Sequence, residues 1–293
     1  MNTAAKVSAL GLGLVLAFGT AWAAGAAVGP LGPASAEAAP VETPELGGLT
    51  DTAGGCRLEL AGQRLVPGVP GGLSFRILGR GDVSVTVFDV DHDQAMHLIF
   101  VRRDGSGYEH LHPTLAADGT WTTQVGPAAA GTYRVIADVT PRGGLKVAWG
   151  ADVQVAGQDE PAPGGPSRTF AVDGYRVDLA GDLRPGAASE VTAMVTKDGA
   201  PVSDLQPYLG AYGHLVALRA ADLGFLHVHP ADGGVTAGPA VRFAADVPVS
   251  GRYRLFLDFR HGGRVHIAEF ALDTITLSGG KPGEHGHLTE GKP

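Results

Sequence analysis

The chain has 293 residues and a formal net charge of −8 at pH 7. Its Lys and Arg residues form no cluster, which excludes nucleic acid as a partner, because affinity for phosphate backbones comes mainly from basic side chains. A composition of 45 Gly, 20 Pro and 44% hydrophobic residues indicates an all-β protein with many turns. The single cysteine, Cys56, excludes an internal disulfide and a zinc site built on several thiolates. Any metal site must therefore use His, Met or carboxylate side chains.

The chain begins with a segment that is typical of export. Lys6 is followed by an uncharged stretch over residues 7–29, and the small residues 34–36 (ASA) would suit a cleavage site. We expect residues 1–36 to be a signal peptide or, alternatively, a membrane anchor through residues 7–29, which are enough to span a bilayer as a helix. In both cases the folded part lies in the cell envelope or outside the cell.

The rest of the chain repeats itself. Residues 56–62 (CRLELAG) match residues 175–181 (YRVDLAG) at an offset of 175 − 56 = 119, and residues 110–113 (HLHP) match residues 227–230 (HVHP) at an offset of 117. Because the offset changes so little along the chain, the repeat predicts two homologous domains of ordinary size. The expected division is a linker at 37–54, a first domain at 55–155, a Pro- and Gly-rich linker at 156–167, a second domain at 168–277 and a disordered tail at 278–293.

Each repeat reads as a series of short strands. Apolar or alternating segments are separated by turn residues, and none has a sustained helical period. In the first repeat the expected strands cover residues 57–60, 73–78, 97–102, 108–112, 121–125, 133–139 and 145–153. Seven strands in about 100 residues predict an immunoglobulin-like sandwich. The expected fold class is all-β, with two tandem immunoglobulin-like β-sandwich domains.

A histidine-rich hairpin is predicted at residues 97–112, around an Asp-Gly turn. A four-residue loop would pair His97 with His112 and Ile99 with His110. Because side chains two residues apart leave a strand on the same face, the three imidazoles would then share one face. A loop of odd length would instead place His97 on the opposite face.

The second repeat keeps the same construction. The equivalent loop pairs Val216 with His227 and His214 with His229, and the spacing H-x12-H-x-H-P is retained while most residues between change. Three imidazoles on one rigid surface can supply most of a zinc or copper coordination shell. Each hairpin is therefore a candidate metal site. The alternative is that these histidines are structural and were inherited by duplication.

Two further candidates precede the first hairpin. His92 and Met96 could complete a copper site, because a thioether together with imidazole suits copper better than zinc. The alternative is that they are a solvated loop histidine and a core methionine. The second repeat has Leu209 and Gly213 at these positions, so two sites would not be equivalent.

Both hairpins resemble sequences of known exported proteins. Residues 92–113 (HDQAMHLIFVRRDGSGYEHLHP) and 206–230 (QPYLGAYGHLVALRAADLGFLHVHP) resemble the H-x-K-x-M-H-L and P-Y-x-G-x-x-G-H patterns of exported bacterial proteins, which are similar to copper-resistance C-type and YtkA-like β-sandwich domains. Gln94 stands where that pattern has Lys. The resemblance implies an envelope protein associated with heavy metals. The candidate ligands are His92, Met96, His97, His110, His112, His214, His227 and His229.

The expected function is to bind or deliver a heavy metal outside the cytoplasm, or to confer resistance to it. Copper is preferred over zinc as the bound ion, and an envelope protein is the expected partner. The alternative is an extracellular immunoglobulin-like interaction module with structural histidines and no metal. The chain contains no G-x-S-x-G, H-E-x-x-H or P-loop motif, and we do not expect an enzyme.

Overall fold

The computed structural model describes residues 46–62, 64–162, 164–226, 228–231 and 236–275. Both repeats belong to one compact unit, Thr43–Pro293. The expected signal or anchor segment, the tail and His227 lie outside the described residues. No helix in the described part of the chain is both long and apolar enough to cross a membrane. Apart from a 3-10 turn at Arg80–Asp82, its regular elements are all strands.

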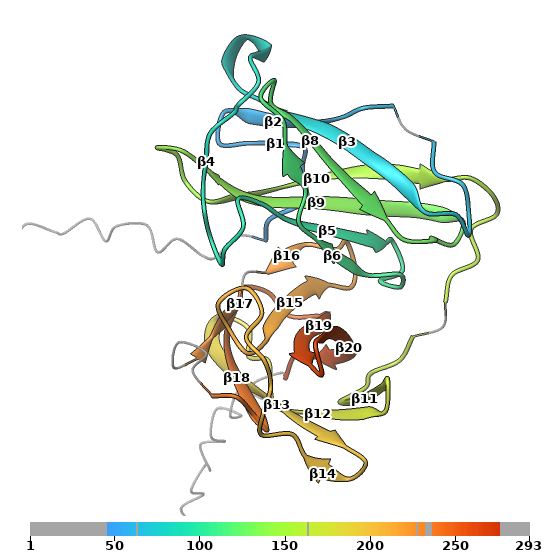
Figure 1. The fold of residues 1–293 in the computed structure, drawn as a ribbon, viewed down its shortest axis with the longest axis vertical. Coiled ribbons are helices and arrows are strands. Elements are labelled where there is room, and N and C mark those ends of the chain that lie inside the picture. Colours follow the sequence, from blue (N-terminus) through green and yellow to red (C-terminus); the bar gives the residue numbers. More distant parts are fainter. Residues whose placement is uncertain (1–45, 63, 163, 227, 232–235, 276–293) are drawn as a thin grey trace, which may run out of the picture. The chain divides into compact units, whose positions relative to one another are not determined.

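The first repeat folds into two facing sheets (Figure 1). One has the strand order β1-β2-β3-β8-β7, and the other β10-β9-β5-β6, with β4 pairing β9. The strands are β1 Thr52–Ala53, β2 Cys56–Leu60, β3 Gly71–Leu78, β4 Phe88–Asp89, β5 His97–Arg102, β6 Glu109–Leu111, β7 Thr114–Leu115, β8 Thr120–Val125, β9 Gly131–Pro141 and β10 Val147–Val155. Such an order, with early and late strands interleaved in each sheet, is that of an immunoglobulin-like sandwich.

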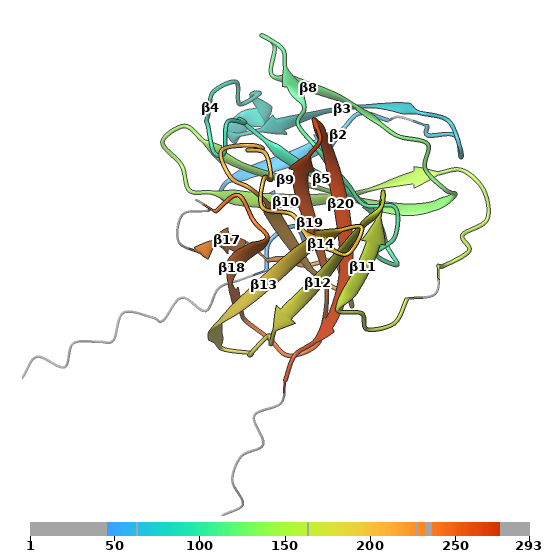
Figure 2. The same cartoon turned by 60° about the horizontal axis from the view of Figure 1, so that its bottom comes forward.

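The second repeat has the same topology, and Figure 2 shows its strands β11, β12 and β13 side by side. Its sheets have the orders β11-β12-β13-β18-β17, with β14 pairing β13, and β16-β15-β19-β20. The strands are β11 Thr169–Val172, β12 Tyr175–Gly181, β13 Ala187–Lys197, β14 Ala200–Pro201, β15 His214–Arg219, β16 Phe225–Leu226, β17 Val228–Pro230, β18 Ala240–Val247, β19 Arg252–His261 and β20 Arg264–Asp273. The predicted fold class, two tandem immunoglobulin-like sandwiches, is confirmed.

Strand β5 is buried on both faces. Leu98 and Phe100 pack inside the first sandwich. Ile99 and Val101, which alternate with them, lie on the outer face in a separate apolar cluster. The continuous apolar sequence of β5 is explained by this arrangement, because both faces of its antiparallel sheet are covered.

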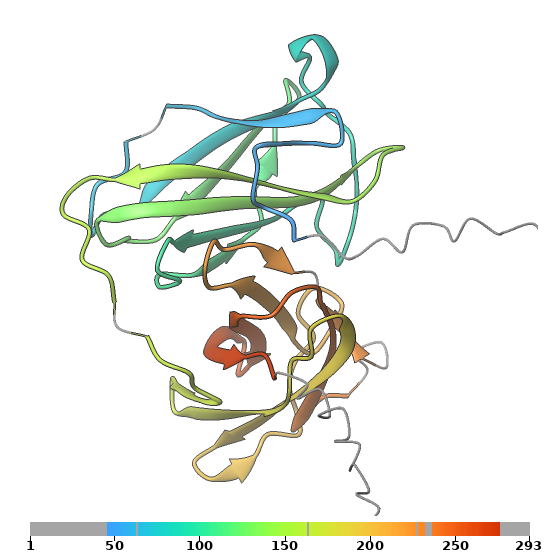
Figure 3. The same cartoon turned by 180° about the vertical axis from the view of Figure 1, so that it is seen from behind.

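This separate cluster, which we call the inter-sandwich core, contains residues of both repeats. Its members are Ile99, Val101, Tyr108 and Ile136 from the first sandwich and Val216, Leu218, Leu223, Phe225 and Phe256 from the second. The rings of Tyr108 and Phe256 stack across it with their centroids 3.9 Å apart and their planes 4° apart. The two sandwiches are thus held together by apolar packing as well as by the linker, which the reader can follow in Figure 3.

Equivalent positions of the two repeats meet in this core. Ile99 corresponds to Val216 (216 − 99 = 117), and Val101 corresponds to Leu218 (218 − 101 = 117), and all four are members. Two copies that contact each other through the same face have the arrangement of a symmetric dimer. The inter-sandwich core therefore has the character of a homodimer interface within a single chain.

Residues 46–50, which the sequence placed in a linker, bridge the two sandwiches. The amide of Gly47 donates to the carbonyl of Phe225 (2.9 Å), and the amide of Gly48 donates to the carbonyl of Ala148 (2.8 Å). The backbone approaches very closely here, since a Cβ atom on Gly150 would lie 1.8 Å from the carbonyl oxygen of Gly48. We call residues 46–50 the N-terminal strap.

Candidate metal centre

The first hairpin has the register that its sequence predicts. Strands β5 and β6 pair Leu98 with Leu111 and Ile99 with His110. His110 therefore lies on the outer face of the sheet, beside Ile99 and toward the inter-sandwich core. The same face carries His97, two residues before Ile99 on β5.

Three imidazoles of this hairpin converge, as predicted. One ring nitrogen from each of His97, His110 and His112 lies within 4.8 Å of the other two. The closest pair is Nδ1 of His97 and Nε2 of His110, which are 3.0 Å apart. The ring centroid of His112 is 4.8 Å from that of His110 and 5.2 Å from that of His97.

Neighbouring acceptors fix the tautomers of two of these rings. Nε2 of His97 lies 3.1 Å from the carbonyl oxygen of Asp91, and Nδ1 of His110 lies 2.5 Å from Oδ2 of Asp258. Because these oxygens accept hydrogen bonds, each of the two nitrogens carries a hydrogen. In neutral rings, Nδ1 of His97 and Nε2 of His110 then each carry a lone pair and no hydrogen. Two lone pairs face each other at 3.0 Å, which is favourable only with a cation or a proton between them.

The third ring adds a buried ring nitrogen without a partner. Nε2 of His112 is buried and has no hydrogen-bond partner in the described part of the chain. A buried polar atom without a partner is uncommon in native proteins and requires a specific explanation. A ligand at the centre of the three histidines would supply the missing partner.

The carboxyl group behind His110 comes from the second sandwich. Asp258 lies on β19, its side chain is 2% exposed, and its Oδ1 lacks a hydrogen-bond partner among the described residues. A carboxylate that holds the N–H of a histidine is the usual support of a metal-binding imidazole, since it orients the ring and raises its basicity. A buried carboxylate also favours positive charge nearby.

Burial keeps the rings of His97 and His112 neutral at neutral pH. It lowers the pKa of His97 to about 4, with a further contribution from His110, and it lowers the pKa of His112 to about 3. Burial also lowers the pKa of His214. Neutral imidazole is the form that binds metal, so these rings are available as ligands at neutral pH.

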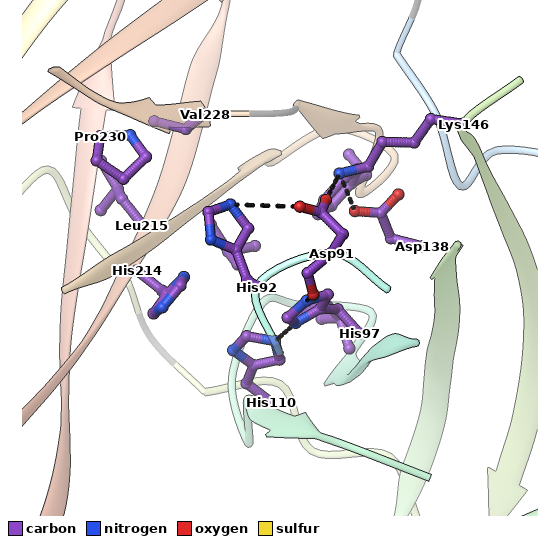
Figure 4. Close-up of a pocket in the computed structure, with 13 residues that line it drawn as sticks. Asp91, His92, His97, His110, Asp138, Lys146, His214, Leu215, Val228 and Pro230 are labelled. Atoms are coloured by element: carbon purple, nitrogen blue, oxygen red, sulfur yellow. Dashed lines mark hydrogen bonds and ion pairs between the residues drawn. The ribbon is translucent and has the colours of Figure 1, made fainter. Parts of the chain in front are cut away.

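His92 and His214 extend the cluster on one side. Their ring centroids are 5.1 Å apart, and that of His92 is 6.3 Å from that of His97. Both line a small cavity together with His97 and His110, as Figure 4 shows. The cavity volume of about 50 Å³ suits an ion with a few waters and is too small for an organic cofactor.

Met96 does not lie with the histidines, contrary to the copper interpretation. It is 1% exposed and belongs to the core of the first sandwich. Successive residues of an extended chain point to opposite faces, so Met96 and His97 cannot both face the cluster. The core alternative is the one that the structure supports.

Among the described residues, which do not include His227, the second hairpin shows no equivalent trio. Strands β15 and β16 pair in the predicted register, with Ala217 opposite Leu226. However, β16 ends at Leu226, and the chain then enters the other sheet as β17. There His229 is exposed and lies opposite Ala244 of β18. His214 instead lies beside the first hairpin's cluster, and the described residues place one histidine cluster where the sequence left open two sites or one shared site.

Sequence reasoning missed Asp258. Its counterpart in the first repeat is Asp138 (258 − 138 = 120), and each lies opposite the first histidine of its own hairpin, His97 with Asp138 and His214 with Asp258. The signal was available, because a single Asp interrupts an otherwise apolar strand in both copies, residues 135–139 (VIADV) and residues 255–259 (LFLDF). A charged residue in a buried strand indicates a partner or a functional site.

Comparison with solved structures gives remote similarities. They include the Escherichia coli adhesin FdeC (12% identity over 77% of this chain and 65% of that chain, TM-score 0.25) and the Yersinia pseudotuberculosis adhesin InvE (10% identity over 74% and 58%, TM-score 0.25). A titin structure is 14% identical over 74% of this chain and 96% of that chain, with a TM-score of 0.20. The chain spans less than two thirds of either adhesin chain, and similarities of this size carry no information about function. A comparison with curated proteins gives no match.

One family of protein domains matches each sandwich separately, over residues 51–157 and residues 170–276. The resemblance of the hairpins to copper-resistance C-type and YtkA-like domains stays a prediction. The two matches together cover most of the chain and coincide with the internal repeat. The protein therefore belongs to the family described as "Domain of unknown function (DUF8832)", of which it contains two tandem copies.

Proposed function

We propose that this protein binds one transition-metal ion between its two sandwiches, in the cell envelope or outside the cell. The ligands are Nδ1 of His97, Nε2 of His110 and Nε2 of His112. The observation that supports this most strongly is the 3.0 Å approach of two ring nitrogens, Nδ1 of His97 and Nε2 of His110, while the other nitrogen of each ring faces an oxygen acceptor. When both rings are neutral and hydrogen-bonded to these acceptors, each of the two nitrogens carries a lone pair, and a cation between them would remove their repulsion.

The separation of the His97 and His110 nitrogens fits a metal ion, and a ring nitrogen of His112 lies within 4.8 Å of both. With metal–nitrogen bonds of about 2.0 Å, two nitrogens bound to one ion lie roughly 2.8 to 3.3 Å apart. Nδ1 of His97 and Nε2 of His110 already have this separation. The site would also receive charge compensation from Asp258, which is hydrogen-bonded to His110.

The donor set favours Cu(II), with Zn(II) as the next candidate. Met96 lies in the core, so a thioether no longer supports copper over zinc. Three imidazoles accept either ion, and for a given set of nitrogen ligands divalent copper binds more tightly than zinc. Copper is therefore the preferred ion on the ground of affinity alone.

Three protein ligands leave a coordination position open. Closed four-ligand sites are typical of structural zinc, whereas sites with three protein ligands can exchange a water or another ligand. The cavity beside His97 and His110, lined by His92 and His214, provides room for such an exchange. We propose that the site takes up metal outside the cytoplasm and passes it to a partner in the envelope.

One observation favours a second function, that of an immunoglobulin-like interaction module without metal. A single proton shared between His97 and His110 would complete a hydrogen-bonded chain ending at Asp258. The inter-sandwich core could then hold the two sandwiches together without an ion. The histidines would in that case be part of the interface only.

The test is titration of the chelator-treated protein with Cu(II) and Zn(II), followed by calorimetry and, for copper, by electron paramagnetic resonance. We expect one ion per chain and a copper spectrum with nitrogen ligands. The double variant His97→Ala, His112→Ala should lose this ion, whereas His229→Ala, which removes an exposed histidine, should retain it. Wild-type protein that binds neither ion would leave the interaction module as the function.

A further inference from the structure

The ligands and their supporting carboxyl group belong to different sandwiches. His97, His110 and His112 lie in the first sandwich, whereas the group that fixes the tautomer of His110 is Asp258 of the second. The carboxyl group of the first sandwich at the equivalent position, Asp138, lies 3.4 Å from the ammonium group of Lys146. The first sandwich therefore carries the ligands, and the second completes the site.

The inter-sandwich core holds these two halves in register. Tyr108 lies directly before β6 and two residues before His110, and Phe256 lies two residues before Asp258 on β19, so each ring is on the side of its chain that carries the polar side chain. The stack of Tyr108 on Phe256 is the apolar contact next to the hydrogen bond between His110 and Asp258. Movement at this stack would displace Asp258 from His110.

We infer that docking of the second sandwich controls metal affinity, with Asp258 as the positioning residue and the ion as a clamp between the sandwiches. The inference rests on the metal site proposed above. When Asp258 lies against His110, the ring presents Nε2 as a lone pair toward His97. When the sandwiches separate, the ring is free to turn and to change its tautomer. By linkage, an ion that binds the docked form more tightly strengthens docking by the same factor.

The first test replaces the positioning residue. Asp258→Asn keeps the size of the side chain and removes the charge, and loss of such a supporting group typically weakens metal binding roughly 10- to 100-fold. We also expect a changed spectrum of bound Cu(II), which a merely structural role would not produce, and partial recovery of affinity in Asp258→Glu. The charge-matched control is Asp273→Asn, at an exposed ion pair with Arg252. Equal affinities and spectra in Asp258→Asn and the control would overturn the role of Asp258.

The second test weakens docking at a distance from the ligands. Leu218 is fully buried in the inter-sandwich core and lies four residues along β15 from His214. Leu218→Ala is expected to lower metal affinity within the range of about 5- to 150-fold that couplings between sites usually span. The control is Leu179→Ala, in the inner core of the second sandwich, which should bind metal as the wild type does. Equal affinities in the two variants would overturn the clamp.

Hydrogen exchange of the wild-type chain provides a readout that needs no variant. Zn(II) should protect backbone amides in β15, β16 and β19, although the second sandwich supplies none of the three ligands. Protection confined to the first sandwich would contradict the inference while leaving the proposed metal site intact. Wild-type protein without measurable metal affinity would remove both.

Discussion

The three proposed ligands differ in what holds them. His97 is anchored by the carbonyl of Asp91 and His110 by the carboxyl group of Asp258, whereas Nε2 of His112 has no hydrogen-bond partner among the described residues. A buried nitrogen without a partner destabilises the fold unless something binds to it. The three rings should therefore respond differently to replacement.

Replacement of His112 by an apolar residue separates metal binding from folding. His112→Leu removes an unpaired buried nitrogen, so the free energy of unfolding in the presence of chelator should stay within about 1 kcal/mol of the wild type. Metal affinity should fall sharply. Urea unfolding and copper titration measure the two effects. A loss of stability well above this value in chelator would indicate that His112 has a structural role.

The buried histidines also predict how stability depends on pH. The pKa is about 4 for His97 and about 3 for His112, against an ordinary value of 6.5. Between these values and 6.5 the unfolded chain binds more protons than the folded protein, so metal-free stability should fall as the pH drops below about 6.5. Urea unfolding between pH 7.5 and 4.5 in chelator measures the slope. The double variant His97→Gln, His112→Gln should have a shallower slope, and an unchanged slope would contradict the assignment.

Among the elements, strand β5 contributes both to the core of the first sandwich and to the histidine cluster. Leu98 and Phe100 belong to the core of the first sandwich, whereas His97 leaves the opposite face of the strand, the face that carries Ile99 and Val101 of the inter-sandwich core. The predicted register places His110 opposite Ile99, and the structure has this pairing. One strand therefore fixes both the sandwich and the position of the histidine cluster.

The N-terminal strap is the other element that joins the sandwiches, and its fit depends on glycine. Gly150→Ala would place a Cβ atom 1.8 Å from the carbonyl oxygen of Gly48, so the strap must move. We expect a loss of about 1–3 kcal/mol or more in the free energy of unfolding, measured with urea. Gly62→Ala is the control, because nothing lies within 4 Å of its added Cβ. Equal stability of the two variants would show that the strap is not tightly fitted.

For the molecule as a whole, duplication accounts for the arrangement. Two copies of one sandwich contact each other through equivalent faces, as the subunits of a symmetric dimer do. Fusion into one chain allows the copies to diverge, because each position now mutates independently. Only the first copy has a histidine at position 92, where the second has Leu209.

Metal binding should therefore stabilise both sandwiches together. A ligand that binds only the folded protein adds about 2.7 kcal/mol at a free concentration of one hundred times Kd. For a protein of this size that corresponds to a rise in Tm of roughly 5 to 10 °C. Thermal unfolding with and without Zn(II) measures the shift, which should be absent in His97→Ala, His112→Ala. A shift of equal size in that variant would place the ion elsewhere.

Patterns among residues close in sequence were sufficient to predict the fold and part of the candidate site. The internal repeat, the short alternating strands and the spacing of the first hairpin predicted two immunoglobulin-like sandwiches and the convergence of His97, His110 and His112. These features follow from contacts between residues close in sequence, which strand periodicity and turn length control. The same alternation could have excluded Met96, since it directly precedes His97.

Contacts between distant residues settled the rest. Asp258 reaches His110 from 148 positions further along the chain, and His214 joins the first hairpin although it belongs to the second. His229 lies in the other sheet because the strand changes partner after Leu226. The placements of Asp258 and His214 depend on how two finished sandwiches pack against each other, whereas that of His229 depends on strand pairing within the second sandwich. The periodicity of a single strand carries no information about that packing, whose energy comes from an apolar core shared between the two repeats.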